Sequence, residues 1–275
     1  SDVLSGSGLS SSAAFEVLLG TILNHLFNDG KVSDVEIAQI AQAAENKFFG
    51  KPCGLLDQMT SSVGSFVEID FADPANPVIE KLDFDFASCG YALCIVDTGG
   101  SHSDLTDEYA AVRKEMESVA EYLGKSVLRE VDEDEFMKNI ADIRSSCGDR
   151  AVLRAMHFYG DNARVEKQAA ALKAGDFETF KKYIIESGRS SYMYNQNVYS
   201  CKKASEQPVS LALSLSEKLL DGCGAWRVHG GGFAGTIQAF VPLNKLDEYK
   251  DLMEKVFGSG SCYILSVRPV GGVEL

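Results

Sequence analysis

A run of apolar residues near the start of the chain, 13–27 (AAFEVLLGTILNHLF), has apolar side chains on nearly every side. Such a stretch suits a helix that is buried within a layer. Directly before it stands a loop rich in glycine and serine, Gly6-Ser7-Gly8-Leu9-Ser10-Ser11-Ser12. Glycines let the backbone approach a ligand closely, and the first N–H groups of a helix lack internal partners and favour an anion. The pattern predicts a phosphate cradle, with a flexible linker or a plain helix cap as the alternative.

The chain of 275 residues carries a net charge of −14, from 40 acidic and 26 basic residues. This charge argues against a general binder of nucleic acid or of anionic membranes, because such binders need a basic stripe. No run approaches 18 apolar residues, and no signal-peptide pattern is visible, so we expect no membrane span and a cytoplasmic location. The seven cysteines show no zinc-site spacing, which favours reduced thiols.

Helix and strand signals alternate along the chain and predict a mixed α and β fold in two domains, with the boundary near residues 85–90. In the first domain we expect helices over 13–27, from 34 to Gly50 and from about Leu56, and strands over 65–71 and 78–84. The second helix should turn Val35, Ile37, Ile40 and Ala44 inward.

The second domain should be built around the strand 91–97, because its continuous apolar run is typical of a central strand. Helices are predicted over 104–123, 132–140, 149–173, 176–187 and 208–221. The remaining elements, strands 225–229 and 236–241, helix 244–257 and strand 262–268, match part of a ferredoxin-like split unit.

Two acidic residues of the first domain are candidates for chemistry. Asp57 lies among small and apolar residues at an expected helix start, where a carboxylate can accept a proton from a substrate hydroxyl. The alternative is an ordinary first-turn acid. Glu45 lies near the end of a helix, where the dipole disfavours an acid. A divalent cation would relieve this, and Mg²⁺ is typically held by one or two carboxylates plus phosphates; a surface glutamate is the alternative.

A second glycine-rich turn, Gly230-Gly231-Gly232-Phe233-Ala234-Gly235, lies between two expected strands. Four glycines in six residues indicate a backbone that packs closely against something. The alternative is a tight connection between strands with no ligand.

The first loop, the segment 53–58 and the turn 230–235 resemble, in order and spacing, the motifs of the GHMP family of sugar and small-molecule kinases, and more narrowly those of its galactokinases. The stretch 96–103 followed by Tyr109 and Arg113, and the segment 186–191, are similar to the same pattern. The resemblance implies an α+β fold. A truncated, ribosomal-protein-S5-like ATP-binding domain would span 1–88, and a ferredoxin-like C-terminal domain with extra helices would span 89–275.

The resemblance also implies an ATP-dependent kinase that phosphorylates the anomeric hydroxyl of galactose. Asp57 would be the base, and Gly54 and Tyr109 would contact the sugar. Ser12 and Glu45 would lie near Mg²⁺. The loop from Gly6 to Ser12 would hold the triphosphate, and Gly231 and Gly232 would belong to a turn that closes over the phosphate side. Two residues depart from the family pattern: Ala234 stands where the family usually has glycine, and Gly188 stands where it often has histidine. These departures leave the exact sugar open.

The family's N-terminal portion, with its sugar-recognition motif, has no counterpart in these residues, and the chain begins with Ser1 rather than methionine. We therefore interpret the chain as a fragment or a processed chain that is inactive alone. Its apolar faces would be exposed and would be met by its own N-terminal segment or in a dimer. Two alternatives remain: a GHMP kinase for N-acetylgalactosamine, arabinose or a mevalonate-type alcohol, and a non-catalytic sugar and ATP sensor that acts through a protein partner. The three serines and Asp57 favour the enzyme.

Overall fold

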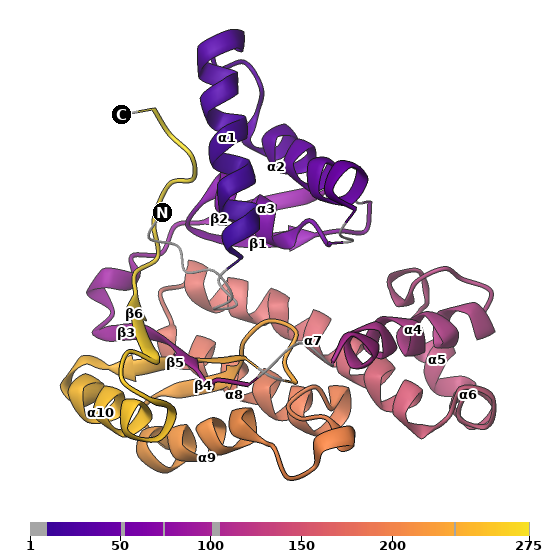
Figure 1. Cartoon of the computed structure of the whole chain (residues 1–275). Helices are drawn as coiled ribbons and strands as arrows, with labels where there is room; N and C mark the ends of the chain where they lie inside the picture. Colours follow the sequence, from indigo (N-terminus) through magenta and orange to yellow (C-terminus); the bar gives the residue numbers. More distant parts are fainter. Residues whose placement is uncertain (1–9, 51–52, 74, 101–104, 234, 275) are drawn as a thin grey trace. The chain divides into compact units, whose positions relative to one another are not determined.

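A computed structural model of the chain describes residues 10–50, 53–73, 75–100, 105–233 and 235–274 (Figure 1). The chain divides into two compact units: unit 1 comprises Ser1–Phe86 and Ser266–Leu275, and unit 2 comprises Ala87–Leu265. The division after Phe86 falls inside the predicted boundary region, but the last ten residues, predicted to lie in the second domain, group with unit 1. In the described ranges, no helix is both long enough and apolar enough to cross a membrane.

Unit 1 consists of helices and one hairpin of strands. Its elements are α1 (Ser11–Asn28), α2 (Asp34–Ala43), the π-helical turn η1 (Ala44–Phe49), α3 (Leu56–Val63), β1 (Phe66–Asp70) and β2 (Val78–Leu82). Strands β1 and β2 pair antiparallel, as the two apolar runs with a turn between them predict. A capping box formed by Ser33 and Glu36 starts α2, and the helical segment ends at Gly50, as predicted, where φ is positive at 76°.

The C-terminal segment belongs to unit 1 because its backbone lies directly on α1 and α3. The Ser65 amide donates a hydrogen bond to the Arg268 carbonyl at 2.7 Å. A side chain on Gly271 would meet the Ser62 carbonyl at 1.7 Å, and one on Gly272 would meet the Thr21 hydroxyl at 2.4 Å. Only glycine fits at such close approaches, so these two glycines allow the segment to pack against unit 1.

Helix α1 is less buried than its sequence predicts. Its buried side chains form one narrow stripe, which includes Val17 packed against Ile37 and Ala41 of α2. The remaining apolar side chains are exposed, for example Leu26 at 69% and Phe27 at 80%. The prediction of a helix enclosed within a layer is therefore wrong for the described residues, because α2, α3 and the C-terminal segment cover only this stripe. The predicted exposure of apolar faces is confirmed on this side of α1.

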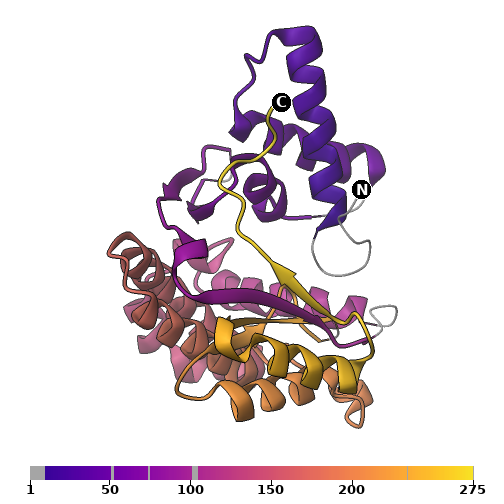
Figure 2. The same cartoon turned by 90° about the vertical axis from the view of Figure 1, so that its left-hand side faces the viewer.

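Unit 2 contains a four-stranded antiparallel sheet and most of the helices of the chain (Figures 1 and 2). The strands are β3 (Tyr91–Asp97), β4 (Ala225–Val228), β5 (Thr236–Pro242) and β6 (Cys262–Leu265). The helices are α4 (Thr106–Tyr122), α5 (Glu133–Lys138), α6 (Ile140–Cys147), α7 (Asp149–Lys173), α8 (Phe177–Ser190), the π-helical turn η4 (Ser191–Asn195), α9 (Pro208–Leu220) and α10 (Leu246–Phe257). Short 3-10 turns are η2 (Phe86–Ser88), η3 (Leu128–Glu130), η5 (Cys201–Lys203) and η6 (Leu243–Lys245). The strand order β4-β5-β3-β6 is that of the predicted ferredoxin-like unit.

Both faces of this sheet are covered, which explains why β3 is apolar along its whole length. Ala92, Cys94 and Val96 belong to a buried cluster with residues of α9 and α10. On the other face, Phe240 of β5 packs edge-on against two rings of α8, Phe177 and Phe180, at 5.8 and 5.4 Å. A strand that is buried on both faces shows no alternation of polar and apolar residues. The prediction that 91–97 is central is confirmed.

Helices α4 to α7 form a separate helical layer of unit 2. Their side chains gather around a second buried cluster that includes Val119, Phe136, Ile143 and Ala155. Helix α7 has the predicted bounds, 149–173, whereas α6 was not predicted.

Substitution of Met59 tests the packing of unit 1. Met59 of α3 is fully buried against Ala38 and Leu55. We expect Met59→Ala to lower the free energy of unfolding by about 2–5 kcal/mol, because it removes buried methylenes and leaves a cavity. The control is Leu56→Ala on the same helix, whose side chain is 55% exposed. Urea unfolding should separate the two variants, and equal losses would contradict the packing of α3.

Candidate functional site

The N-terminal end of α1 has the chemistry of an anion site, as the serine run predicts. Gly6, Ser7, Gly8 and Leu9 lie outside the described residues, whereas Ser10, Ser11 and Ser12 are described. Ser10 precedes the helix in a left-handed conformation with φ 55°, and no described side chain caps this end of α1. The first turn contains no acidic residue. The N–H groups here and the positive end of the helix dipole therefore favour a negatively charged group.

Glu45 is joined to this end of α1. Its side chain is only 2% exposed, and the Ser12 hydroxyl donates a hydrogen bond to Glu45 Oε1 at 3.3 Å. Gln58 Nε2 donates to the other oxygen, Oε2, at 2.9 Å. A buried carboxylate is costly unless it is hydrogen-bonded or paired with a cation. Glu45 is thus a buried acid rather than a surface glutamate, and it lies beside Ser12, as the metal hypothesis requires.

A magnesium ion fits the oxygen atoms that Ser12 and Glu45 present. Mg²⁺ prefers oxygen ligands and is usually held by one or two carboxylates together with substrate phosphates. Among the described residues, no group of three or more His, Cys, Asp or Glu side chains makes a protein-only metal cage. The Glu45 carboxylate and the Ser12 hydroxyl lie beside the anion-favouring end of α1. This arrangement suits an Mg²⁺ ion that the protein would hold together with substrate phosphates.

Gly54 shortly before α3 and Asp57 in its first turn are both exposed. Asp57 is exposed in the first turn of α3, whereas the next residue, Gln58, is buried and reaches Glu45. A side chain added at Gly54 would meet no atom within 4 Å, so the space beside Gly54 is open. The structure therefore places the Asp57 carboxylate where solvent or a substrate can reach it.

In unit 2, Tyr109 lies against the glycine turn, which we define as residues 230–235. The Tyr109 hydroxyl donates to the Gly232 carbonyl at 2.7 Å, and its ring packs edge-on against Phe233 at 5.3 Å. A side chain on Gly231 would meet the Tyr109 ring at 2.7 Å. Burial raises the pKa of Tyr109, so the hydroxyl keeps its proton for this bond. The sequence-predicted residues of unit 2 are therefore in direct contact.

Sequence reasoning missed two residues that hold these contacts. Gln58 stands in a quoted motif but received no role, although its amide binds Glu45. Asn197 holds the glycine turn: its carbonyl accepts from the Phe233 amide at 2.5 Å, and its Nδ2 donates to the Gly231 carbonyl at 3.2 Å. The sequence has a polar run here, Asn195-Gln196-Asn197, but this run does not by itself indicate a contact with the glycine turn.

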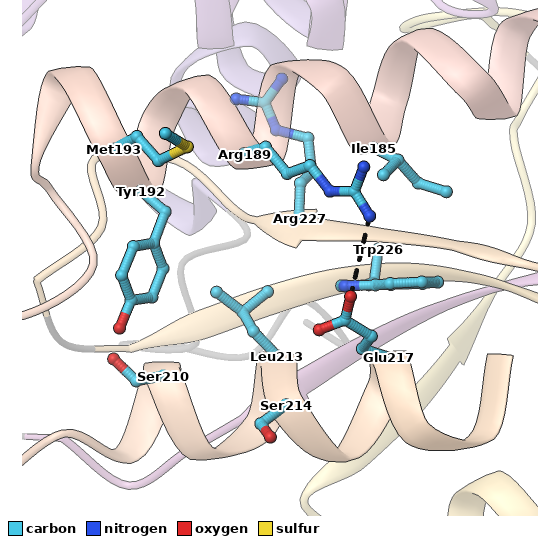
Figure 3. A pocket seen from close by; sticks show the side chains of 11 residues that line it. Ile185, Arg189, Tyr192, Met193, Ser210, Leu213, Ser214, Glu217, Trp226 and Arg227 are labelled. Atoms are coloured by element: carbon cyan, nitrogen blue, oxygen red, sulfur yellow. Dashed lines mark ion pairs between the residues drawn. The ribbon is translucent and has the colours of Figure 1, made fainter. Parts of the chain in front are cut away.

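A cavity of about 420 Å³ lies elsewhere in unit 2, between α8, α9 and the edge strand β4 (Figure 3). Trp226 and Leu213 line it, and so do Arg189 and Glu217, which form an ion pair with 3.7 Å between Nη2 and Oε1. Arg227, which also lines the cavity, donates to the Ser187 hydroxyl at 2.8 Å. The lining contains none of the predicted site residues, so this cavity is separate from the candidate site.

Comparison with known proteins points to one family. A model of the GHMP kinases N terminal domain matches residues 1–65. A galactokinase of Actinobacillus pleuropneumoniae is 31% identical over 253 residues, which cover 92% of this chain and 63% of that protein. A galactokinase of Homo sapiens is 32% identical over 275 residues, which cover 100% of this chain and 66% of that protein. The chain thus spans less than two thirds of the length of these relatives.

Solved structures agree on the fold. The crystal structure of Lactococcus lactis galactokinase complexed with galactose matches with a TM-score of 0.74 at 23% identity, over 98% of this chain and 68% of that one. A mevalonate kinase of L. major in complex with R-mevalonate matches with a TM-score of 0.59 at 14% identity, over 95% of this chain and 66% of that one. The two-domain α+β fold expected from the sequence is therefore confirmed.

The reactivity of Cys53 tests the position of Glu45. Burial and the neighbouring Glu45 carboxylate raise the pKa of the Cys53 thiol to about 11. At pH 8 only about a thousandth of this thiol is ionised, so iodoacetamide should alkylate it slowly. Glu45→Gln removes a negative neighbour of the thiolate, so the pKa should fall and alkylation of Cys53 should accelerate. Peptide mass spectrometry follows both rates, with the exposed Cys201 as internal control; an unchanged Cys53 rate in the variant would contradict the contact.

Proposed function

The chain belongs to the GHMP kinase family, and on that premise we propose that it acts in the ATP-dependent phosphorylation of a sugar, galactose, at its anomeric hydroxyl. Galactokinase relatives at 31% and 32% identity support the reaction class and favour an enzyme over the non-catalytic sensor. The observation that carries the proposal is the contact between Ser12 and the buried Glu45 carboxylate, because it joins an acid to the anion-favouring end of α1.

The phosphates of ATP would lie at the N-terminal end of α1. Ser10 and Ser11 would offer backbone N–H groups and hydroxyls, together with the loop Gly6-Ser7-Gly8-Leu9, and the helix dipole would stabilise the negative charge. Ser12 and Glu45 would hold magnesium. Bound magnesium supplies positive charge to the phosphate oxygens, which phosphoryl transfer needs more than covalent chemistry. In a chain of net charge −14, the helix end and the metal would supply most of this positive field.

Asp57 would act on the sugar. In the transfer step, the anomeric oxygen forms a bond to the γ-phosphorus while the bond from that phosphorus to the bridging oxygen breaks, and ADP leaves. The hydroxyl proton passes to the Asp57 carboxylate, which is exposed at the first turn of α3 and therefore reachable by a substrate. Gly54, with open space beside it, would let the sugar approach the backbone closely.

Unit 2 would contribute Tyr109 and the glycine turn. The Tyr109 hydroxyl is held by the Gly232 carbonyl, so the ring has a fixed orientation in which it can contact the sugar. The exposed Gly231 and its neighbour Gly232 would close over the phosphate side. A turn without side chains at these positions lets backbone approach a bulky triphosphate.

We also propose that activity requires a segment N-terminal to Ser1. The coverage of only 63% of the A. pleuropneumoniae relative supports this, and so does the exposed face of α1, with Phe15 60% and Phe27 80% exposed. Apolar patches of this kind mark surfaces that bind another segment or chain. A dimer through the same face is the alternative occupant.

The dependence on such a segment is directly testable. We expect the 275-residue chain to show no ATP- and galactose-dependent release of ADP, and the full open reading frame that contains it to be active. A coupled ADP assay with galactose, N-acetylgalactosamine and arabinose measures both proteins and also ranks the sugars. Turnover by the 275-residue chain alone would overturn the dependence.

Replacement of Asp57 tests the proposed base. In the active protein we expect Asp57→Asn to lower kcat by about 10²–10⁴-fold, because the amide cannot take the hydroxyl proton. The matched control is Asp29→Asn, which removes the same charge at the C-terminal end of α1, roughly 27 Å along this 18-residue helix from the proposed phosphate site at its N-terminal end. Asparagine tolerates the left-handed conformation of Asp29. Full activity of Asp57→Asn would exclude Asp57 as the base.

A further inference from the structure

Residues 195–200, which we call the strap, pack against the glycine turn and are hydrogen-bonded to it. At the middle of the strap, the Asn197 carbonyl accepts from the Phe233 amide, and the Asn197 side chain donates to the Gly231 carbonyl. A side chain on Gly232 would meet the Asn197 carbonyl at 1.9 Å. The turn therefore rests directly on Asn197, and a shift of the strap shifts the turn.

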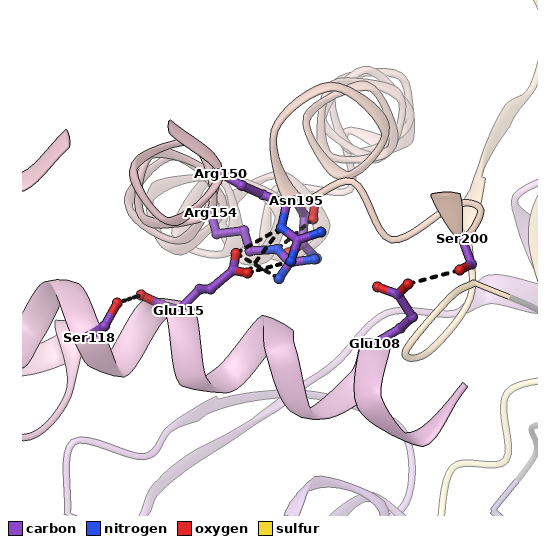
Figure 4. A network of polar contacts seen from close by, with 7 residues as sticks. All are labelled: Glu108, Glu115, Ser118, Arg150, Arg154, Asn195 and Ser200. Carbon is purple, nitrogen blue, oxygen red and sulfur yellow. Dashed lines mark hydrogen bonds and ion pairs between the residues drawn. The ribbon is translucent and has the colours of Figure 1, made fainter. Parts of the chain in front are cut away.

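Arg154 of α7 holds the first end of the strap (Figure 4). Its side chain is 0% exposed, and its Nε donates to the Asn195 carbonyl at 3.0 Å. Its Nη1 donates to Glu115 of α4 at 2.9 Å. Arg150 binds the same carboxylate, with Nε at 3.0 Å from Oε1, but within the described part of the chain it forms no hydrogen bond to the strap. Arg154 thus ties the strap to two helices at once.

Glu108 of α4 holds the other end. The Ser200 hydroxyl donates to Glu108 Oε1 at 2.9 Å, and both side chains are buried. Glu108 is the direct neighbour of Tyr109, whose hydroxyl donates to the Gly232 carbonyl at 2.7 Å. One turn of α4 therefore contacts both the strap and the glycine turn above it.

We propose that Arg154 and Glu108 are positioning residues for the glycine turn: they fix the two ends of the strap, and Asn197 between these ends sets the place of Gly231 and Gly232. The link to catalysis rests on the proposed function, whereas the mechanical link does not.

The chemistry of the contacts supports a role in geometry more than in stability. Arg154 Nη2 is buried and has no hydrogen-bond partner among the described residues. Burying a cation with one unsatisfied donor is unfavourable, so the guanidinium is a weak source of stability. Its planar fork nevertheless fixes the direction of two bonds at once, one to a carboxylate and one to a backbone carbonyl. Lysine cannot reproduce this arrangement.

Hydrogen exchange measured by mass spectrometry on the 275-residue chain tests the mechanical link. We expect Arg154→Met and Ser200→Ala to accelerate exchange in peptides that cover the strap and Phe233 by about tenfold, as expected when a charged or buried hydrogen bond is lost. Exchange in β3 should stay unchanged. The matched control is Arg150→Met, which removes another partner of Glu115 without touching the strap.

The outcomes are distinct. Faster exchange in the strap and turn for the two variants but not for Arg150→Met supports the proposal. Equal acceleration in Arg150→Met, no acceleration in the first two, or uniform acceleration that includes β3 would overturn it. Should Arg154→Met not fold, Arg154→Lys and Ser200→Ala provide the same comparison.

A second readout addresses catalysis in the full open reading frame. Ser200→Ala should lower kcat by about tenfold while KM for ATP changes little, because a displaced turn impairs the transferring phosphate more than ground-state binding. An unchanged kcat together with faster exchange would overturn the catalytic part. A wild-type protein without kinase activity would refute the proposed function and leave the exchange result standing.

Discussion

The double pairing of strand β3 is the constraint on which unit 2 depends. β3 pairs antiparallel with β5 on one side and with β6 on the other, so its residues are fixed along its whole length. Thr98 follows directly and donates from both its amide, at 2.9 Å, and its hydroxyl, at 2.6 Å, to the Gly235 carbonyl. The end of the central strand is thereby tied to the glycine turn. Helix α4 starts eight residues later and brings Tyr109 to the same turn.

The sequence predicts elements best where local pattern and tertiary burial agree. β3 has its predicted bounds because its apolar run is enclosed on both faces of the sheet. α7 has its predicted bounds because it begins directly after Gly148 and ends shortly before Gly175. The prediction fails where burial depends on distant parts of the chain. Helix α1 looks apolar all round, but its neighbours cover one stripe, and Ile40 of α2 is 57% exposed although its spacing turned it inward. The close packing of Gly271 against the Ser62 carbonyl cannot be predicted from the local sequence, because it depends on a residue far away in the chain.

The candidate site divides in the same way. Ser12, Glu45 and Asp57 could be proposed as site residues from the sequence. A serine at a helix start and an acid near a helix end suggest specific chemistry from their positions alone. The structure brings Ser12 and Glu45 together across 33 residues of sequence. Asn197 and Arg154 escaped notice because each acts on a backbone carbonyl or amide, and such partners carry no sequence signature. Residues that orient a site are therefore harder to predict than those that perform its chemistry.

Two π-helical turns in the described part of the chain explain how these side chains are aimed. η1 follows α2 without a break and ends at Gly50, and η4 follows α8 without a break and ends at Gln196, each in the left-handed conformation. A π-helical turn widens the helix, changes the direction in which the next side chains point, and is frequent at functional sites. The first turn contains Glu45, and the second delivers the chain into the strap. In both units, a helix that would continue past the site is instead widened and stopped by a left-handed residue. Glu45 in the first turn can then face Ser12 of α1, and the strap after the second turn can face the glycine turn.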